Sequence, residues 1–264
     1  MADNEGPGLF YLVARTSDPK LEIWALKADL AEASLKIVVS APDGETGKIP
    51  AAKVSSFARD YGLLAGINTV PFDPVSAREG EERTCVGIVV SGGVLVAPPV
   101  PRYDALVFYK ADNAENHRRA AIVPQGEIGS LDSVENAVGG FRIILREGGL
   151  PERLLSGNNA SQSEPPRHPR SAAGLSADGS ILYLLVIDGR RPGSAGATEA
   201  ETGLILRQLG ADWGLNFDGG GSTALALRFP DGQVRTVNKP VHGGIPGRER
   251  AVAACLGIAL ARRD

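Results

Sequence analysis

Residues 168–190 read HPRSAAGLSADGSILYLLVIDGR, and this stretch predicts a β-hairpin. Two apolar runs, 170–175 and 180–187, flank the turn sequence SADG at 176–179. Apolar runs that are separated by a short glycine-containing turn are typical of adjacent antiparallel strands. The stretch therefore predicts antiparallel β-structure.

The register of this hairpin determines which polar residues meet at its end. With the turn centred near Asp178, residues 168–170 lie across from residues 186–188. A carboxylate between guanidinium groups is either a surface ion pair or part of an anion clamp with an acid–base group beside it. Four polar residues meet at this end of the hairpin: His168, Arg170, Asp188 and Arg190.

A second stretch, LNFDGGGSTAL at 215–225, ends an apolar strand with a glycine-rich turn. Consecutive glycines permit positive φ and let a ligand touch the main chain, whose N–H groups bind anions. Asn216 and Asp218 leave the strand just before this turn, where site residues are often found. The alternative is a strained hairpin turn in which Asp218 bonds to its own loop.

Ser222 follows the glycines without completing a known catalytic motif. No Lys precedes it, which excludes a P-loop, and Ala224 stands where the G-x-S-x-G nucleophile motif requires glycine. We therefore expect Ser222 to hydrogen-bond to a ligand or to the loop rather than to act as a nucleophile.

The rest of the chain predicts further strands and few helices. Val54–Tyr61 has apolar residues at helical spacing, and Thr198 with Glu201 forms the S/T-x-x-E pattern that begins a helix, which ends at Gly210. Residues 251–260 are apolar throughout, and we favour a central strand there. Other strands are expected over 9–13, 21–30, 35–40, 63–68, 86–90, 94–97, 105–109, 213–217, 223–229 and 233–237.

These elements predict an α+β fold. We expect a mixed, mostly antiparallel β-sheet core with a few packed helices in a single domain. Residues 1–8 are expected to be a frayed lead-in, so the domain is assigned to residues 9–264.

Composition excludes several functional classes. The 264 residues carry 28 Lys and Arg against 31 Asp and Glu, a net charge of −3, so no affinity for nucleic acid is implied. No apolar run is long enough to form a transmembrane segment, and the opening MADNEGPGLF shows no signal peptide. The histidines show no paired spacing, so a histidine-bound transition metal is not expected. Cys85 and Cys255 are either two buried thiols or one long-range bridge.

Five blocks of the sequence resemble the phosphodiester glycosidase family and stand in the family's order. They are NAVGGFRIIL at 136–145, HPRSAAGLSADGSILYLLVIDGR at 168–190, the helix segment at 196–210, LNFDGGGSTAL at 215–225 and RERAVAACLGIAL at 248–260. A weaker match runs through residues 54–68, where the family has an Asn at the end of a strand. Relatives usually continue with two glycines and an aromatic residue, whereas this chain continues Thr69-Val70-Pro71-Phe72.

The resemblance implies a mixed α/β domain that hydrolyses a sugar-1-phosphodiester, either a small molecule or a glycan, to a free sugar and a phosphomonoester. It also implies residence outside the cytoplasm: periplasmic, secreted or luminal. No cofactor is expected. Such a substrate needs cationic groups for its phosphate and a carboxyl group for attack or proton transfer at the sugar.

On this basis we assign the phosphate clamp to Arg170 and Arg250, with Arg190 assisting or holding Asp188. Asp218 and Asp188 are the candidates for nucleophile or base, in either order. The substrate-binding groups are expected to be His168, Asn68, Asn216, Ser222 and the main-chain N–H groups of Gly219, Gly220 and Gly221.

Two other functions are consistent with the same residues. A metal-dependent phosphodiesterase would bind Ca²⁺ or Mg²⁺ through Asp188, Asp218 and Asn216, because these cations prefer oxygen ligands. A glycan-binding or envelope scaffold protein without catalysis is the other alternative, and the altered loop after Asn68 is its motivation.

Overall fold

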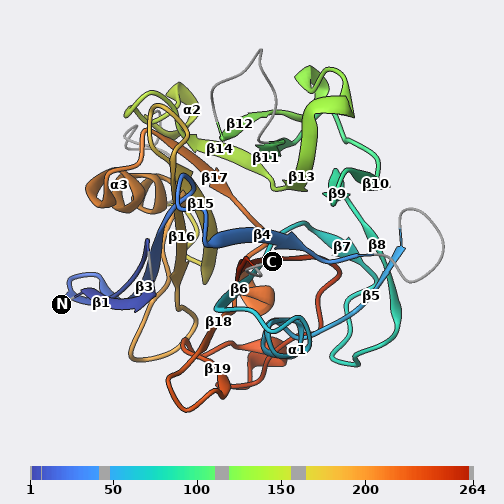
Figure 1. Ribbon diagram of the computed structural model, residues 1–264. Helices are drawn as coiled ribbons and strands as arrows, with labels where there is room; N and C mark the ends of the chain where they lie inside the picture. The colour runs from blue at the N-terminus through green and yellow to red at the C-terminus, as the bar shows by residue number, and fades with distance from the viewer. Residues whose placement is uncertain (1, 7, 42–47, 111–118, 156–164, 262–264) are drawn as a thin grey trace.

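We analysed a computed structural model of the chain, which describes residues 2–6, 8–41, 48–110, 119–155 and 165–261. Strands dominate these residues and form four sheets, accompanied by three α-helices (Figure 1). Every strand-to-strand pairing in the described part of the chain is antiparallel. The expected antiparallel sheet core with a few helices is therefore confirmed, with strands in a larger majority than the α+β class implies.

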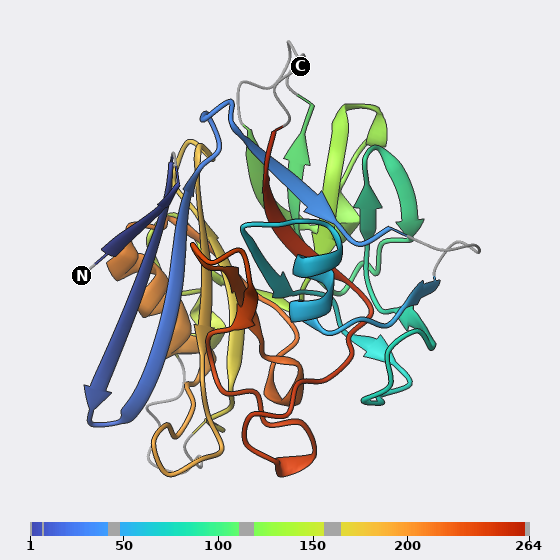
Figure 2. The same ribbon diagram turned by 60° about the horizontal axis from the view of Figure 1, so that its bottom comes forward.

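The largest sheet has seven strands in the order β1-β2-β3-β16-β15-β17-β14. Figure 2 shows β2 and β3, in blue, along one side of the molecule beside β16 and β15. Residues 2–6, which the sequence assigns to a frayed lead-in, form an edge strand on β2, because ladder hydrogen bonds need only backbone groups. The strands are β1 (Ala2–Gly6), β2 (Leu9–Ser17), β3 (Lys20–Asp29), β14 (Arg142–Leu145), β15 (Arg170–Leu175), β16 (Ile181–Ile187) and β17 (Trp213–Asn216).

The expected hairpin is β15 and β16, with a register that differs by one residue from the prediction. Arg170 pairs with Ile187 instead of with residue 186. The reason lies in the turn, where the N–H of Ser176 donates to the carbonyl of Ile181 and leaves a four-residue loop between them. Beyond the strand ends His168 contacts Arg190, as the prediction expects, whereas Asp188 bonds to Arg191.

Helix α3 (Glu199–Leu209) packs on one face of this sheet. Thr198 and Glu201 form the predicted capping box, and Gly210 ends the helix with φ of 106°. The close approach depends on Gly174, because a Cβ there would lie 3.1 Å from Leu206 of the helix. The sequence therefore places this helix correctly in the chain, and small residues of the sheet let it pack closely.

A second sheet has the order β19-β18-β6-β20-β4. β20 lies between β6 and β4, which confirms the central strand expected in the apolar run at the end of the chain. Helix α1 (Val54–Asp60) packs against Gly66 of β6, where a Cβ would lie 3.4 Å from Ala58. The strands are β4 (Leu35–Val39), β6 (Ala65–Asn68), β18 (Leu225–Arg228), β19 (Val234–Thr236) and β20 (Cys255–Leu260).

Two further sheets complete the described structure, in the orders β10-β9-β13-β11-β12 and β5-β8-β7. The local sequence pattern does not predict β5, β7, β8, β12, β13 or β14, several of which are too short for a periodic pattern to show. The strands are β5 (Lys48–Pro50), β7 (Phe72–Asp73), β8 (Glu82–Cys85), β9 (Val89–Ser91), β10 (Val94–Ala97), β11 (Asp104–Tyr109), β12 (Ala120–Pro124) and β13 (Val134–Gly139). The short helices are α2 (Glu152–Leu155), η1 (Gln125–Glu127), η2 (Leu131–Ser133), η4 (Gly220–Ser222) and η5 (His242–Gly244).

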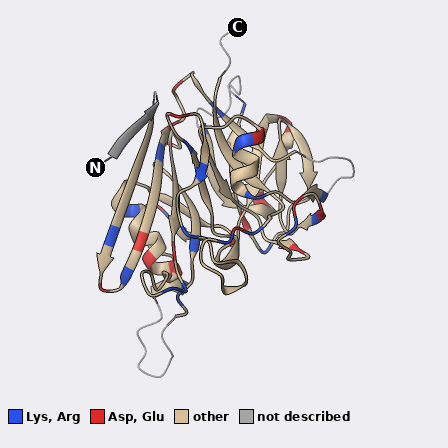
Figure 3. Ribbon diagram, turned by 90° about the horizontal axis from the view of Figure 1, so that it is seen from below, with Lys and Arg blue, Asp and Glu red and all other residues tan. Residues whose placement is uncertain are grey.

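All four sheets contribute to one hydrophobic core. A single cluster of buried side chains contains residues from each sheet, among them Leu26, Ile67, Phe72 and Leu106. Cys85 and Cys255 are both buried and free, which agrees with the buried-thiol alternative rather than a bridge. Basic and acidic residues are interspersed over the described chain (Figure 3), and none of its helices is long and apolar enough to span a membrane.

Candidate active site

Asp218 is held where two sheets meet. Its N–H donates to the carbonyl of Thr69 at 2.8 Å, and its carbonyl accepts from Nδ2 of Asn68 at 2.6 Å. Asn68 ends β6 of the second sheet, whereas Asp218 follows β17 of the largest sheet. The main chain at Asp218 is thus fixed by both sheets.

The Asn68 side chain also fixes the loop that follows Asp218. Its Oδ1 accepts hydrogen bonds from Oγ of Ser171 at 2.7 Å and from the N–H of Ala224 at 3.1 Å. The residue is only 1% exposed. The sequence assigns Asn68 to a sugar hydroxyl, and the structure places its amide among three protein groups that hold Asp218 and Ala224 in position.

The glycine loop, residues 219–222, turns sharply and contacts the chain just before β15. Gly220 has φ of 61°, a value that favours glycine, and its N–H donates to the carbonyl of Pro169 at 2.9 Å. A Cβ on Gly219 would lie 2.7 Å from the same carbonyl, so a side chain there would collide with the main chain. The three consecutive glycines therefore have a steric reason in this loop.

Two guanidinium groups lie against this loop. A Cβ on Gly220 would lie 3.1 Å from Nη2 of Arg190, and one on Gly221 would lie 2.4 Å from Nη2 of Arg250. Arg250 also donates from Nη1 to Oγ of Ser222 at 3.1 Å. The absence of side chains at the glycines lets both cations reach the backbone.

Arg190 has a strained backbone in addition to its exposed side chain. Its φ is 58°, in the left-handed region that residues other than glycine rarely adopt. Such strain is found most often at functional sites, where the surrounding structure enforces it. The next residue, Arg191, is anchored by ion pairs with Asp188 and Glu22.

Arg170 lies on the side of the site next to α3. Its Nε donates to the carbonyl of Ala197 at 2.8 Å, and its Nη1 lies 4.0 Å from a carboxylate oxygen of Glu199. The charge of Arg170 still reaches the site, because it helps to lower the pKa of His168. The sequence assigns the clamp to Arg170 and Arg250, whereas the cations that lie over the glycine loop are Arg190 and Arg250.

The carboxyl group of Asp218 is the acidic group of this cluster. Burial raises its pKa to about 6, although a hydrogen bond from Ser222, the charge of Arg250 and the N–H of Gly219 act in the opposite direction. A carboxyl group that titrates near neutral pH is suited to accept or donate a proton, or to attack in its ionised form.

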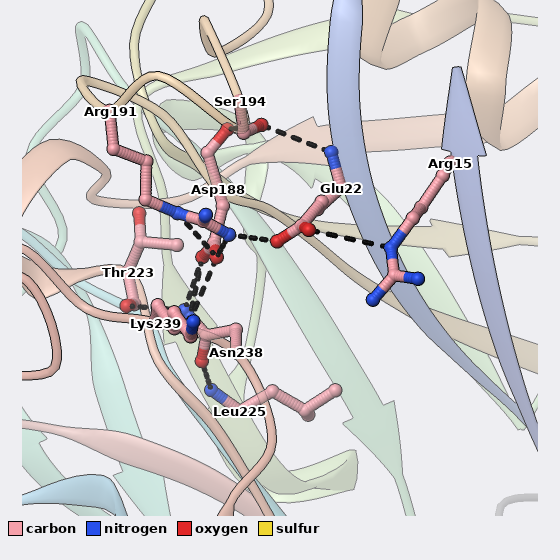
Figure 4. A network of polar contacts seen from close by, with 9 residues as sticks. All are labelled: Arg15, Glu22, Asp188, Arg191, Ser194, Thr223, Leu225, Asn238 and Lys239. Carbon is pink, nitrogen blue, oxygen red and sulfur yellow. Dashed lines mark hydrogen bonds and ion pairs between the residues drawn. The ribbon is translucent and has the colours of Figure 1, made fainter. Parts of the chain in front are cut away.

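Asp188, the other candidate carboxylate, is buried in a network of protein donors (Figure 4). It is 1% exposed, and it accepts from Nδ2 of Asn238 at 2.9 Å and from the N–H of Lys239 at 3.0 Å. Arg191 donates to it from Nη2 at 2.5 Å and also pairs with Glu22. Burial raises the pKa of Asp188, and these donors act against that rise.

Of the two alternatives for Arg190, holding Asp188 does not fit the structure, because Arg191 is the partner of Asp188, whereas assisting the clamp agrees with the position of Arg190 against the glycine loop. The left-handed turn at Arg190 directs the two arginines to different groups: Arg191 to Asp188 and Arg190 to the glycine loop. The sequence shows two adjacent arginines, and nothing in their order indicates which one pairs with Asp188.

Two histidines contact the arginines of the site. Nδ1 of His168 lies 3.1 Å from Nη2 of Arg190, and Nδ1 of His242 accepts from Nε of Arg250 at 3.0 Å. Burial and the neighbouring arginines lower the pKa of both histidines. His242 is absent from the sequence-based assignment, and its only sequence signal is its position in a glycine-rich loop shortly before Arg250.

A family model described as phosphodiester glycosidase matches residues 61–259, which include all of these groups except Glu22. The chain belongs to the phosphodiester glycosidase family. A search of curated proteins finds no match to the sequence.

Three solved structures resemble this member of the family. The catalytic domain of zebrafish N-acetylglucosamine-1-phosphodiester alpha-N-acetylglucosaminidase, auto-inhibited by its pro-peptide, has a TM-score of 0.71 and 18% identity, over 98% of this chain and 86% of that one. A hypothetical protein from Synechocystis has a TM-score of 0.65 and 16% identity, over 99% of this chain but only 63% of its own length. A protein described as a putative exported protein, from Burkholderia pseudomallei, has a TM-score of 0.66 and 16% identity. The match covers 91% of this chain and 74% of that one. At these identities the likeness establishes the fold.

Asn216 occupies a different position from the other residues predicted for the site. It is 3% exposed on β17 and pairs with Arg142 and Ala172 on the neighbouring strands. Its Oδ1 has no hydrogen-bond partner among the described residues. The described residues also contain no group of three or more His, Cys, Asp or Glu that could hold a metal ion.

Proposed function

We propose that this member of the phosphodiester glycosidase family hydrolyses a sugar-1-phosphodiester to a free sugar and a phosphomonoester. One observation carries the proposal: the carboxyl group of Asp218, whose pKa burial raises to about 6, stands beside a glycine loop against which Arg190 and Arg250 lie. The cations match the negative charge of a phosphodiester, and the carboxyl group matches the positive charge that develops at the anomeric carbon.

In the proposed reaction the bond between the anomeric carbon and the bridging oxygen breaks. The phosphomonoester leaves with that oxygen, while Arg190 and Arg250 stabilise its charge. Asp218 acts in its ionised form, either by attacking the anomeric carbon or by taking a proton from the attacking water. The oxygen of water ends on the sugar in both cases, and its protons end on the sugar and the phosphomonoester or solvent.

The surroundings of Asp188 support a positioning role for this second carboxylate. Its side chain accepts hydrogen bonds from Asn238, Lys239 and Arg191 and is almost completely buried. Asn238 in turn donates to the carbonyl of Thr223, next to the glycine loop, at 3.1 Å. We therefore assign the chemistry to Asp218 and the orientation of its loop to Asp188.

The structural neighbours support two finer parts of the proposal. The zebrafish neighbour is named for N-acetylglucosamine-1-phosphodiester, so an N-acetylglucosamine diester is the first substrate to test. The Burkholderia neighbour is described as exported, which supports a site of action outside the cytoplasm.

The decisive experiment is hydrolysis in water labelled with oxygen-18. A panel of sugar-1-phosphate methyl diesters, beginning with N-acetylglucosamine, is incubated with the enzyme, with and without a chelator. Mass spectrometry of both products then locates the label. We expect the label on the free sugar, unlabelled methyl phosphate, and equal rates with and without chelator.

The matched control is Asp231→Asn, because Asp231 is an exposed carboxylate on the turn between β18 and β19. It should be as active as wild type, whereas Asp218→Asn should not. Label on the phosphate would instead show attack at phosphorus. Activity that chelator removes and Mg²⁺ or Ca²⁺ restores would indicate a metal-dependent phosphodiesterase, and ligand-induced thermal stabilisation without product would indicate a binding protein.

A further inference from the structure

Each arginine that lies against the glycine loop contacts the Nδ1 atom of a histidine. Arg190 approaches His168 at 3.1 Å, and Arg250 donates to His242 at 3.0 Å. A guanidinium group only donates hydrogen bonds, so both Nδ1 atoms are acceptors. Each pairing therefore requires a neutral histidine with its proton on Nε2.

The two pairs come from separate parts of the chain. His168 precedes β15 and Arg190 follows β16, whereas His242 lies in η5 and Arg250 precedes β20. The fold thus produces the same pairing twice around one loop.

The two imidazole acceptors carry no charge. Arg191 pairs with the carboxylates of Asp188 and Glu22, but no ion pair in the described part of the chain includes Arg190 or Arg250. A carboxylate partner would neutralise a guanidinium and compete with an anionic ligand, whereas an imidazole nitrogen orients it and leaves its charge available.

We propose that His168 and His242 are positioning residues that aim Arg190 and Arg250 at one anion over the glycine loop while leaving both positive charges available to it. The inference rests on the proposed function only in naming that anion as the phosphate of the substrate.

The charges around each histidine fit this role. Arg170 and Arg190 act on His168, and Arg248 and Arg250 act on His242. Together with burial, these positive charges lower the pKa of both histidines, which keeps Nδ1 available as an acceptor at neutral pH. Asp218 is the carboxylate whose charge acts on Arg250.

The test separates an acceptor from a space-filling side chain. His242→Leu introduces a side chain of similar size that has no hydrogen-bond acceptor, whereas His242→Asn keeps an acceptor at the δ position. His168 is given the same two substitutions. The probe is sulfate, which carries two negative charges over the working pH range and is not turned over. Its dissociation constant is measured by calorimetry at pH 7.5, and KM and kcat are measured with the diester.

We expect each Leu variant to weaken sulfate binding about tenfold and each Asn variant to stay within about threefold of wild type. The Leu variants should raise KM by more than they lower kcat, because the clamp holds the phosphate in both the ground state and the transition state. In a double-mutant cycle, adding His242→Leu to Arg250→Ala should cause no further loss, since the histidine acts through that arginine.

Three results would overturn the inference: sulfate affinity unchanged in the Leu variants, equal losses with Leu and with Asn, or sulfate affinity unchanged by Arg190→Ala and Arg250→Ala. His242→Ala replaces the Leu variant if thermal melting shows that the latter does not fold. The protein could bind sulfate as expected and yet release no sugar from any diester. That result would contradict the proposed function and still support the positioning role of the histidines.

Discussion

The carbonyl of Thr69 accepts a hydrogen bond at 2.8 Å from the N–H of Asp218, although the two residues are far apart in the sequence. Thr69 belongs to the loop whose sequence departs from the family pattern. Its hydroxyl group donates to the carbonyl of Ala254 at 3.0 Å, so the loop is itself held by the chain next to β20. The altered loop therefore takes part in positioning the central carboxyl group of the site.

Asp218→Asn should abolish turnover and stabilise the protein at neutral pH. A folded-state pKa of about 6 lies above the usual 3.8, so the folded state loses stability as pH rises from 3.8 to about 6, and the full loss is present above pH 6. Removing the charge should raise the free energy of unfolding by about 1–3 kcal/mol at pH 7.5. Urea unfolding at pH 7.5 and at pH 4 measures the difference in the free energy of unfolding between the variant and wild type. This difference should disappear at pH 4. A variant that is destabilised at pH 7.5 would contradict the buried position of the charge.

The pH dependence of kcat/KM should follow the same group. Since Asp218 acts in its ionised form and burial raises its pKa to about 6, activity should rise through pH 6 and level off above it. A phosphodiester keeps one negative charge over this range, so the profile reports on the protein. Initial rates between pH 4.5 and 8.5 with limiting substrate test the prediction. Activity that falls as pH rises through 6 would assign Asp218 the role of a general acid instead.

Asp188→Asn should reduce stability more than chemistry. Burial raises the pKa of Asp188, so removing its charge relieves part of a desolvation penalty. The substitution also places an NH2 group among the donors Arg191, Asn238 and Lys239 and leaves the buried Arg191 without this carboxylate, and breaking such a buried pair costs about 3 kcal/mol. We expect this loss of pairing to exceed the gain from removing the charge. Chemical unfolding measures the loss, with Asp231→Asn as the control because its exposed ion pair with Arg235 contributes little. At a temperature where Asp188→Asn is folded, its kcat should fall at least tenfold less than that of Asp218→Asn. Equal losses of kcat would place Asp188 in the chemistry.

Gly221→Ala should weaken substrate binding by displacing an arginine. An added Cβ would lie 2.4 Å from Nη2 of Arg250, so the guanidinium group must move away from the loop. We expect KM to rise about tenfold, as for the loss of a charged hydrogen bond. Gly129→Ala is the matched control, because a Cβ there meets nothing within 4 Å. An unchanged KM in Gly221→Ala would show that substrate binding does not depend on the position of Arg250 over the loop.

The local patterns of the sequence were sufficient to predict the elements that carry the site. Alternating and continuous apolar runs predict the hairpin of β15 and β16, and Thr198 with Glu201 predicts the start of α3, because both depend on residues that are neighbours in the chain. The three glycines likewise indicate a loop with special backbone geometry, which Gly220 confirms with its positive φ.

What the sequence alone determined is thus the main elements that carry the site, the family and the chemical types of the residues near the site. Which of them touch was decided by tertiary structure. Arg191 rather than Arg190 pairs with Asp188, and His242 meets Arg250, because loops from two sheets converge on the glycine loop. Such contacts depend on the backbone direction at single residues and on long-range packing, and neither leaves a periodic signal in the chain.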